Sequence, residues 1–309
     1  MKVMVLGAGA LGGYFGARLQ EAGHDVAYVA RGEHLAALQA DGLRVESPLG
    51  DIRLPHVHAV ADPREAGPAD LVLFMVKTYD AETAARALKP LMRPDTLVIT
   101  AQNGVSAQPI LAAAVGRSAV LPGAVYMPAD IRAPGVIRHS AAFHRIVFGP
   151  WEAEAMQGAR DIRTAFTSAG LDAQVSDDIW ALLWQKFVMM AANSAITTLT
   201  RLDIGPIRET PETLDLLRRL VDETFQVARA THPSVGEDAA AKALDFLLRE
   251  APPTMHASML DDLRRGKRLE LPWLSGEVVR RGRALGIDTP AHEVVVGALM
   301  PYAQGNPAA

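Results

Sequence analysis

The first half of the chain alternates short apolar runs with longer stretches of mixed polarity. Apolar runs at 3–6, 25–30, 70–77 and 96–104 are each followed by a segment with helical character. Strands that are apolar throughout and separated by helices are typical of a parallel sheet covered on both faces. The pattern therefore predicts an α/β domain, which we place over residues 1–176.

Two stretches of this half depart from the alternation of strands and helices. The runs 43–48 and 51–60 are separated only by Leu49 and Gly50, which predicts a hairpin inserted into the domain. Residues 119–150 consist of strand-like runs and turns with no helical segment between them. Parallel neighbours need a long crossover, so we expect an antiparallel edge there.

The pattern changes after residue 176, where five or six helical segments follow one another without a convincing strand. Asp177 or Asp178 supplies an N-cap for the first of these helices. We therefore predict an all-helical domain over residues 177–309.

The helical segment 179–200 is almost entirely apolar and carries one full charge, Lys186. On a wheel of 100° per residue, apolar side chains surround Lys186, and Asn193 lies within about 20° of it. A helix that is apolar all round is buried, and its Gln, Asn, Ser and Thr residues argue against a membrane span. The wheel leaves two alternatives open, a lysine that reaches water along its stem and a lysine with a function.

A glycine pattern directly follows the first predicted strand. Gly7, Gly9 and Gly12 fit G-x-G-x-x-G between a strand and a helix, inside a βαβ unit of about 30 residues. Gly7 permits a tight turn, Gly9 admits a pyrophosphate close to the backbone, and Gly12 allows close helix packing. The predicted dinucleotide-binding loop consists of Gly7, Ala8, Gly9, Ala10, Leu11 and Gly12.

The end of the second predicted strand bears on which dinucleotide binds. Folds that bind NAD usually place Asp or Glu there to hold the ribose hydroxyls, whereas this chain has Ala30 and Arg31. A guanidinium binds a 2′-phosphate in a fork, and a carboxylate repels it. We therefore expect NADPH as the cofactor, with Glu33 turning to the ribose as the alternative.

Polar residues end two further predicted strands. Lys77 follows one apolar run, and Asn103 follows the next. Ligands of open α/β sheets bind at the carboxyl ends of the strands, so both residues are candidate cofactor or substrate contacts. The alternatives are a solvated strand-end lysine and an Asn-Gly turn.

Composition narrows the classes of partner. The net charge is −4, so nothing favours nucleic acid or an anionic membrane as a partner. The absence of cysteine excludes disulfides and thiolate metal sites, and fits a cytoplasmic location. The apolar run near the N-terminus is short and broken by glycines, which indicates a strand rather than a signal peptide. His56 and His58 alternate along a strand, but no third ligand completes a metal site.

Several blocks together resemble the ketopantoate reductase (2-dehydropantoate 2-reductase) family. They keep one order and spacing along nearly the whole chain, namely GAGALGG at 7–13, VARGEHLAAL at 29–38, VKTYD at 76–80, QNGV at 102–105, IWALLWQKF at 179–187 and SMLDDLRRGKRLELPWLSG at 258–276. The resemblance implies a Rossmann domain followed by a helical domain. It also implies NADPH as hydride donor and a small 2-keto acid as substrate, reduced to a 2-hydroxy acid.

The resemblance also implies roles for individual residues. Lys186 matches the catalytic lysine that protonates the carbonyl oxygen, and Glu270 matches a glutamate near the reacting centre. Asn103 matches an asparagine shared by cofactor and substrate, and Ser258 a serine that meets the substrate carboxylate. Arg31 and Lys77 match contacts to the phosphate end of the adenosine.

The chain departs from the family where asparagines four and eight positions after the lysine are expected. Met190 and Ser194 stand there, and Ile204 replaces a further polar contact. Methionine is a poor hydrogen-bond partner for the hydroxyl of ketopantoate. We expect Asn193 to substitute for the missing asparagines and to contact the substrate together with Ser194.

Two alternatives to a ketopantoate reductase remain open. One is a reductase of a different 2-keto or 3-hydroxy acid on the same scaffold. The other is a dinucleotide sensor without catalysis, which has no need of a costly charge at Lys186. A homodimer through the helical domain is expected only by analogy.

Overall fold

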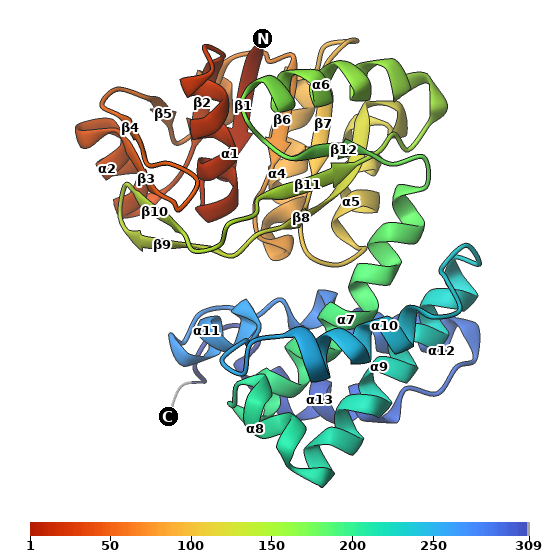
Figure 1. Ribbon diagram of the computed structural model, residues 1–309. Helices are drawn as coiled ribbons and strands as arrows, with labels where there is room; N and C mark the ends of the chain where they lie inside the picture. The colour runs from red at the N-terminus through yellow and green to blue at the C-terminus, as the bar shows by residue number, and fades with distance from the viewer. Residues whose placement is uncertain (308–309) are drawn as a thin grey trace. The chain divides into compact units, whose positions relative to one another are not determined.

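The computed structural model describes residues 1–307 and contains two compact units (Figure 1). The first comprises Met1–Gln102 and Ala107–Ile179, and the second comprises Asn103–Ser106 and the chain from Trp180 onward. The first unit is an α/β domain with a mainly parallel sheet, and the second is helical. The predicted fold class is therefore confirmed.

An eight-stranded sheet forms the centre of the first unit. Its strands lie in the order β12 (Ala173–Val175), β11 (Arg145–Phe148), β8 (Val120–Tyr126), β7 (Leu97–Thr100), β6 (Leu71–Phe74), β1 (Lys2–Leu6), β2 (Asp25–Val29) and β5 (His58–Val60). All neighbours from β8 to β5 pair in parallel, whereas β11 pairs with β8 in antiparallel fashion. The expected antiparallel edge is thus confirmed at this side of the sheet.

Helices cover both faces of this sheet because successive side chains of a buried strand point to opposite sides. Val3 and Val5 of β1 join one apolar cluster, with α1 (Ala10–Glu21) and α6 (Met156–Ser168). Met4 and Leu6 join the other, with α4 (Ala81–Leu88) and α5 (Ala107–Val115). The remaining helices of the unit are α2 (Gly32–Asp41), α3 (Pro63–Ala66) and the 3₁₀ turns η1 (Thr78–Asp80), η2 (Lys89–Leu91), η3 (Arg117–Ala119) and η4 (Ala153–Ala155).

A second sheet, of four strands, is only partly what the sequence predicts. Its order is β4 (Ile52–Leu54), β3 (Leu43–Glu46), β10 (Val136–His139) and β9 (Ala129–Ala133). The predicted hairpin is confirmed by the antiparallel pairing of β3 with β4. The prediction that residues 51–60 form a single strand of this hairpin was wrong for β5, which belongs to the large sheet and pairs there with β2 at the edge.

A buried polar cluster ties this small sheet to α1. The Tyr14 hydroxyl lies 2.7 Å from Nδ1 of His144, and Nδ1 of His139 lies 2.9 Å from the Ser47 hydroxyl. The rings of His139 and His144 stack with their centroids 6.3 Å apart. Burial lowers the pKa of both histidines, so the neutral rings are favoured here.

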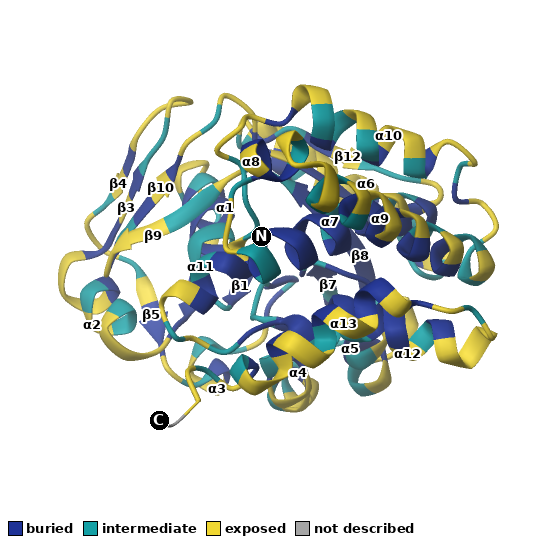
Figure 2. Ribbon diagram, turned by 90° about the horizontal axis from the view of Figure 1, so that it is seen from below, coloured by how far each residue is buried: buried dark blue, intermediate teal, exposed yellow. Residues whose placement is uncertain are grey.

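The second unit holds seven α-helices within the described residues, one or two more than the apolar pattern predicts. They are α7 (Ile179–Thr200), α8 (Ile204–Glu209), α9 (Pro211–Thr231), α10 (Ala239–Asp245), α11 (Ser258–Arg264), α12 (Ser275–Leu285) and α13 (Pro290–Leu299), with a π-helical turn η5 (Phe246–Glu250) and 3₁₀ turns η6 (Leu271–Trp273) and η7 (Met300–Tyr302). In the first unit, central strands such as β6 and β8 are buried along nearly their whole length, whereas β9 of the small sheet is largely exposed (Figure 2).

Helix α7 is buried along most of its length, as the wheel predicts. It begins directly after Asp178 and spans 22 residues. Among residues 1–307, no helix combines the length and the apolar character needed to cross a membrane.

A carboxylate and an imidazole attach α13 to α9. Glu223 accepts hydrogen bonds from the backbone N–H groups of Ala291 (2.8 Å) and His292 (3.0 Å), and so caps the N-terminus of α13. Nε2 of His292 lies 2.8 Å from the Thr224 hydroxyl and 3.1 Å from the Leu220 carbonyl. Its Nδ1 is buried and has no hydrogen-bond partner among the described residues. A proton added at Nδ1 would therefore stay unsatisfied.

This arrangement predicts acid sensitivity of the helical unit. Burial lowers the pKa of His292 to about 4, below its value of 6.5 in an unfolded chain. Between pH 6.5 and 4 the unfolded chain binds a proton that the folded protein does not, so stability declines as the pH falls from 6.5 to 4 and levels off below 4. Urea unfolding should show a free energy about 3 kcal/mol lower at pH 4 than at pH 7, and His292→Gln should remove most of this difference. His56→Gln, at an exposed position, is the control. An equal pH dependence in all three proteins would contradict the prediction.

Candidate active site

The glycine loop between β1 and α1 has open space at only one of its three glycines. A Cβ atom at Gly7 would lie 2.7 Å from the Val76 nitrogen, and the φ of +100° at Gly7 also disfavours other residues. A Cβ at Gly12 would lie 2.3 Å from the Gly7 carbonyl oxygen. At Gly9, the N-cap of α1, a Cβ would meet nothing within 4 Å. Protein atoms therefore fill the space beside Gly7 and Gly12, whereas the space beside Gly9 is open to a phosphate.

A cavity of about 300 Å³ adjoins this loop at the carboxyl ends of the parallel strands. The loop contributes Gly7, Ala8 and Gly9, and the end of β2 contributes Ala30 and Arg31. The segment after β6 and further elements contribute His34, Met75, Val76, Lys77, Asp80, Thr83 and Ile131. Of the residues predicted to bind the dinucleotide, Gly7, Ala8, Gly9, Arg31 and Lys77 thus share one cavity.

Charged side chains at this cavity include some that the sequence did not reveal. Arg31 is 73% exposed, and its guanidinium lies 3.7 Å from the carboxylate of Asp80. Arg31 also borders an adjoining cavity of about 540 Å³, together with Asp62 and Arg64. These two pair with each other, and the Arg64 guanidinium holds the pKa of Asp62 at about 2. Strands β2 and β5 are neighbours in the sheet, and each is followed by an arginine, Arg31 after β2 and Arg64 after β5.

Lys186 lies on α7 in the second unit. Leu183 and Phe187 beside it are buried, and Met190, one turn later, is half-buried like Lys186 itself. Burial lowers the pKa of Lys186 from 10.5 to about 8, because the apolar surroundings disfavour the charged form. An amine with this pKa is a competent proton donor near neutral pH.

Three segments of the second unit converge next to Lys186. A Cβ at Gly104 would lie 3.3 Å from the Trp273 carbonyl oxygen and 3.6 Å from the Phe187 ring. The Glu270 carbonyl accepts hydrogen bonds from the backbone of Trp273 and Leu274, at 3.0 and 3.1 Å. Asn103, Lys186 and Glu270 therefore belong to segments that pack on one another. The Glu270 side chain is only 8% exposed, which excludes a solvated helix-end carboxylate.

The later turns of α7 carry buried polar groups. Oδ1 of Asn193 and Oγ of Ser194 are buried and have no hydrogen-bond partner among the described residues. The Thr197 hydroxyl donates to the Asn193 carbonyl (2.7 Å) and accepts from the Ala257 N–H (3.3 Å). Ser258, which follows Ala257, is exposed at the first residue of α11. The later turns of α7 therefore carry polar atoms that are able to hydrogen-bond, and they are linked through Ala257 to the exposed Ser258.

Two residues at which the chain departs from its family pattern lie in the same unit. Met190 is half-buried, and Ile204 is fully buried at the start of α8. Neither offers the hydrogen bond of an asparagine.

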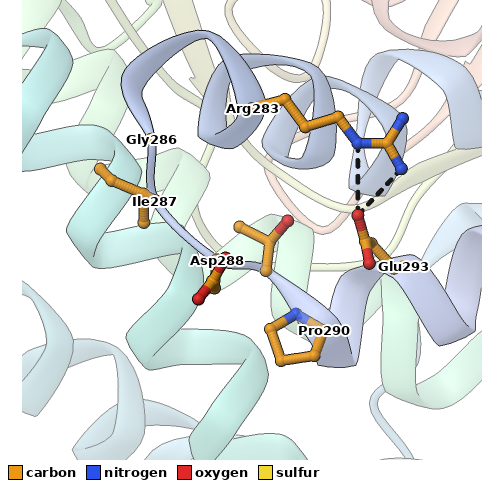
Figure 3. Close-up of a pocket in the computed structure, with 7 residues that line it drawn as sticks. Arg283, Gly286, Ile287, Asp288, Pro290 and Glu293 are labelled. Carbon is orange, nitrogen blue, oxygen red and sulfur yellow. Dashed lines mark hydrogen bonds and ion pairs between the residues drawn. The ribbon is translucent and has the colours of Figure 1, made fainter.

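Other candidates lie apart from these groups. A cavity of about 400 Å³ lies before α13, and no predicted site residue lines it. Arg283 pairs there with Glu293 at 2.9 Å (Figure 3). Within residues 1–307, no group of three or more His, Cys, Asp or Glu side chains is arranged to hold a metal ion. His56 and His58 are both exposed, and only His58 belongs to a strand.

Comparison with known families covers both units. The family described as ketopantoate reductase PanE/ApbA matches residues 3–153, and the ketopantoate reductase PanE/ApbA C terminal family matches residues 178–303. A 2-dehydropantoate 2-reductase of Halobacterium salinarum is 34% identical over 94% of this chain and 95% of its own. An uncharacterized oxidoreductase of Bacillus subtilis, YkpB, is 30% identical over 98% of this chain and 99% of its own.

Solved structures agree with this assignment. A PanE/ApbA family ketopantoate reductase from Ralstonia eutropha superposes with a TM-score of 0.90 at 34% identity, covering 98% of both chains. D-Mandelate dehydrogenase in a ternary structure with NADH and anilino(oxo)acetate gives a TM-score of 0.89, again over 98% of both chains, but at 20% identity it shows only a shared fold. The chain belongs to the ketopantoate reductase family of oxidoreductases.

Proposed function

We propose that this protein reduces a 2-keto acid to a 2-hydroxy acid with NADPH, and that 2-dehydropantoate (ketopantoate) is the first substrate to test. The observation that carries the proposal is the lowered pKa of Lys186, on an apolar helix that packs beside the segments of Asn103 and Glu270. The 2-dehydropantoate 2-reductases among its relatives support the same reaction.

In this proposal the domain predicted over residues 1–176 binds the dinucleotide. The space left open at Gly9 and the adjoining cavity fit a pyrophosphate and a nucleoside. The loop Gly7–Gly12, Lys77 and Asn103 hold the cofactor, and the exposed guanidinium of Arg31 favours the 2′-phosphate of NADPH. The bound cofactor supplies the hydride.

The domain predicted over residues 177–309 holds the proton donor and most of the substrate contacts in this proposal. Lys186 donates a proton to the carbonyl oxygen as the carbon is reduced, and so neutralises the developing alkoxide. Glu270 lies at the reacting centre as the second catalytic residue. Ser258, Asn193, Ser194 and Asn103 hold the substrate, with Ser258 at its carboxylate.

A second candidate substrate follows from Met190. A half-buried methionine one turn from Lys186, with Ile204 buried, presents hydrocarbon where ketopantoate would offer a hydroxyl. A 2-keto acid with an apolar side chain suits that surface better. The reaction type is the same in both cases.

Two substitutions in the glycine loop test the predicted binding of the dinucleotide. Gly9→Ala should fold with a melting temperature close to that of the wild type, because its Cβ meets no protein atom, but its methyl should weaken NADPH binding at least about tenfold. Gly12→Ala should lower the melting temperature itself, because its Cβ would meet the Gly7 carbonyl at 2.3 Å. Fluorescence titration with NADPH and thermal unfolding check both variants. Equal NADPH affinity of wild type and Gly9→Ala would contradict the assignment of the loop.

Turnover with a panel of acids tests the reaction. Ketopantoate, straight-chain and branched 2-keto acids and phenyl-substituted 2-keto acids are each mixed with enzyme and NADPH, and then with NADH, while absorbance reports cofactor oxidation. We expect oxidation with at least one 2-keto acid, and a lower Kd for NADPH than for NADH. Tight NADPH binding without oxidation by any acid would support a sensor instead, and an equal or lower Kd for NADH would reject the cofactor preference.

The proton donor predicts a pH dependence. Because the protonated amine is the reactive form, kcat/KM for reduction should be level below pH 8 and fall about tenfold per unit above it. Lys186→Ala should lose at least about a hundredfold in rate. In Lys186→Arg the guanidinium stays protonated, so any remaining activity should not decline near pH 8. An unchanged rate in the alanine variant would exclude Lys186 as the donor.

A further inference from the structure

His256 lies two residues before Ser258, with its imidazole between two carboxylates. Nδ1 of His256 is 2.9 Å from Oδ1 of Asp203, which precedes α8, and Nε2 is 3.2 Å from Oδ1 of Asp261, in the first turn of α11. The side chain is 25% exposed, and Nδ1 is also 3.3 Å from the Thr254 carbonyl oxygen. The ring thus joins the α7–α8 connection to the start of α11.

Backbone hydrogen bonds join the same two segments. The Ile204 N–H donates to the Met255 carbonyl at 2.9 Å, and the Gly205 N–H donates to the Pro253 carbonyl at 2.8 Å. A Cβ at Gly205 would lie 3.0 Å from that same Pro253 oxygen, so the approach is close. The segment that precedes α11 is therefore hydrogen-bonded to the start of α8, which follows α7.

Two further contacts extend this junction to the later turns of α7. The Ala257 N–H donates to the Thr197 hydroxyl, which itself donates to the Asn193 carbonyl. Arg264 of α11 donates to the carbonyl of Arg201, whose φ of +60° is unusual for a residue other than glycine. Asn193 and Ser258 are thereby both linked to one junction, in which the His256 ring lies between the carboxylates of Asp203 and Asp261.

We propose that His256 is a positioning residue that holds Ser258 against the Asn193 side of α7 and shields the anionic substrate from Asp203 and Asp261. This inference rests on the proposed function. Nε2 of His256 lies within hydrogen-bond distance of Asp261, whereas Nδ1 lies near the Thr254 carbonyl oxygen and within ion-pair distance of Asp203, so the ring occupies the space between the two carboxylates. Loss of the ring leaves two carboxylates beside the place where the substrate carboxylate binds, and like charges repel.

We expect loss of the His256 side chain to change KM rather than kcat. Contacts to the substrate carboxylate are the same in the ground state and the transition state, so weakening them raises KM and leaves kcat unchanged. A purely structural role would instead lower the melting temperature without a selective change in KM.

The experiment compares His256→Gln, the double variant His256→Gln/Asp203→Asn and the control His58→Gln, using the best 2-keto acid found for the wild type. We expect His256→Gln to raise KM about tenfold with kcat within about twofold of wild type and an unchanged Kd for NADPH. The double variant should recover part of the lost KM because one carboxylate has been neutralised. His58→Gln, at an exposed position of the other unit, should match the wild type.

The outcomes separate this inference from the proposed function. An active wild type with an unmoved KM in His256→Gln overturns the inference alone, as does a double variant that is no better than the single one. A wild type that reduces no 2-keto acid overturns the proposed function and this inference with it. If His256→Gln does not fold, the same KM comparison is made with His256→Asn.

Discussion

The proposed chemistry depends on the desolvation of one ammonium group, that of Lys186. Lowering the pKa of Lys186 from 10.5 to about 8 corresponds to about 3 kcal/mol of unfavourable environment for the charged form. A pKa of about 8 still leaves about nine in ten molecules protonated at pH 7. The apolar surroundings are therefore strong enough to make the amine a better acid, but too weak to discharge it.

Other segments pack against the aromatic side chains of α7 near Lys186. Phe187 faces the Gly104 loop, and Trp184 packs edge-on to Phe187 with ring centroids 5.6 Å apart. The guanidinium of Arg281 lies 5.0 Å from the Trp184 ring centroid, while Arg281 also pairs with the buried carboxylate of Glu277. These contacts fix the rotation of α7 about its axis, and so the direction of Lys186.

Local patterns predicted the parts of the fold that depend on neighbouring residues. The glycine loop, the apolar strands and the all-apolar helix around Lys186 are visible in short windows of sequence. The small sheet was not, because β3 pairs with β10 across some ninety residues, which no local period reports. The same reason hides the packing that buries Glu270. For His256, the sequence showed its nearness to Ser258 but not the carboxylate of Asp203, which only tertiary structure brings to the ring.

The reaction type is constrained more tightly than the substrate. A lysine with a lowered pKa beside a reducible carbonyl can do one thing well, which is to deliver a proton to the oxygen. Under the proposed function, the residues on either side of that lysine select the side chain of the acid, and these residues differ along the helix. One turn after Lys186 stands Met190, which offers hydrocarbon, and two turns after it stands Asn193, about 10 Å along the axis, whose Oδ1 is buried without a hydrogen-bond partner in residues 1–307. A buried acceptor left unsatisfied is costly, so a ligand that donates a hydrogen bond there gains affinity that a shorter acid cannot. Under the proposed function, we therefore expect substrate choice to depend on two features, namely whether the acid reaches from its carbonyl to Asn193 and whether it places hydrocarbon at Met190.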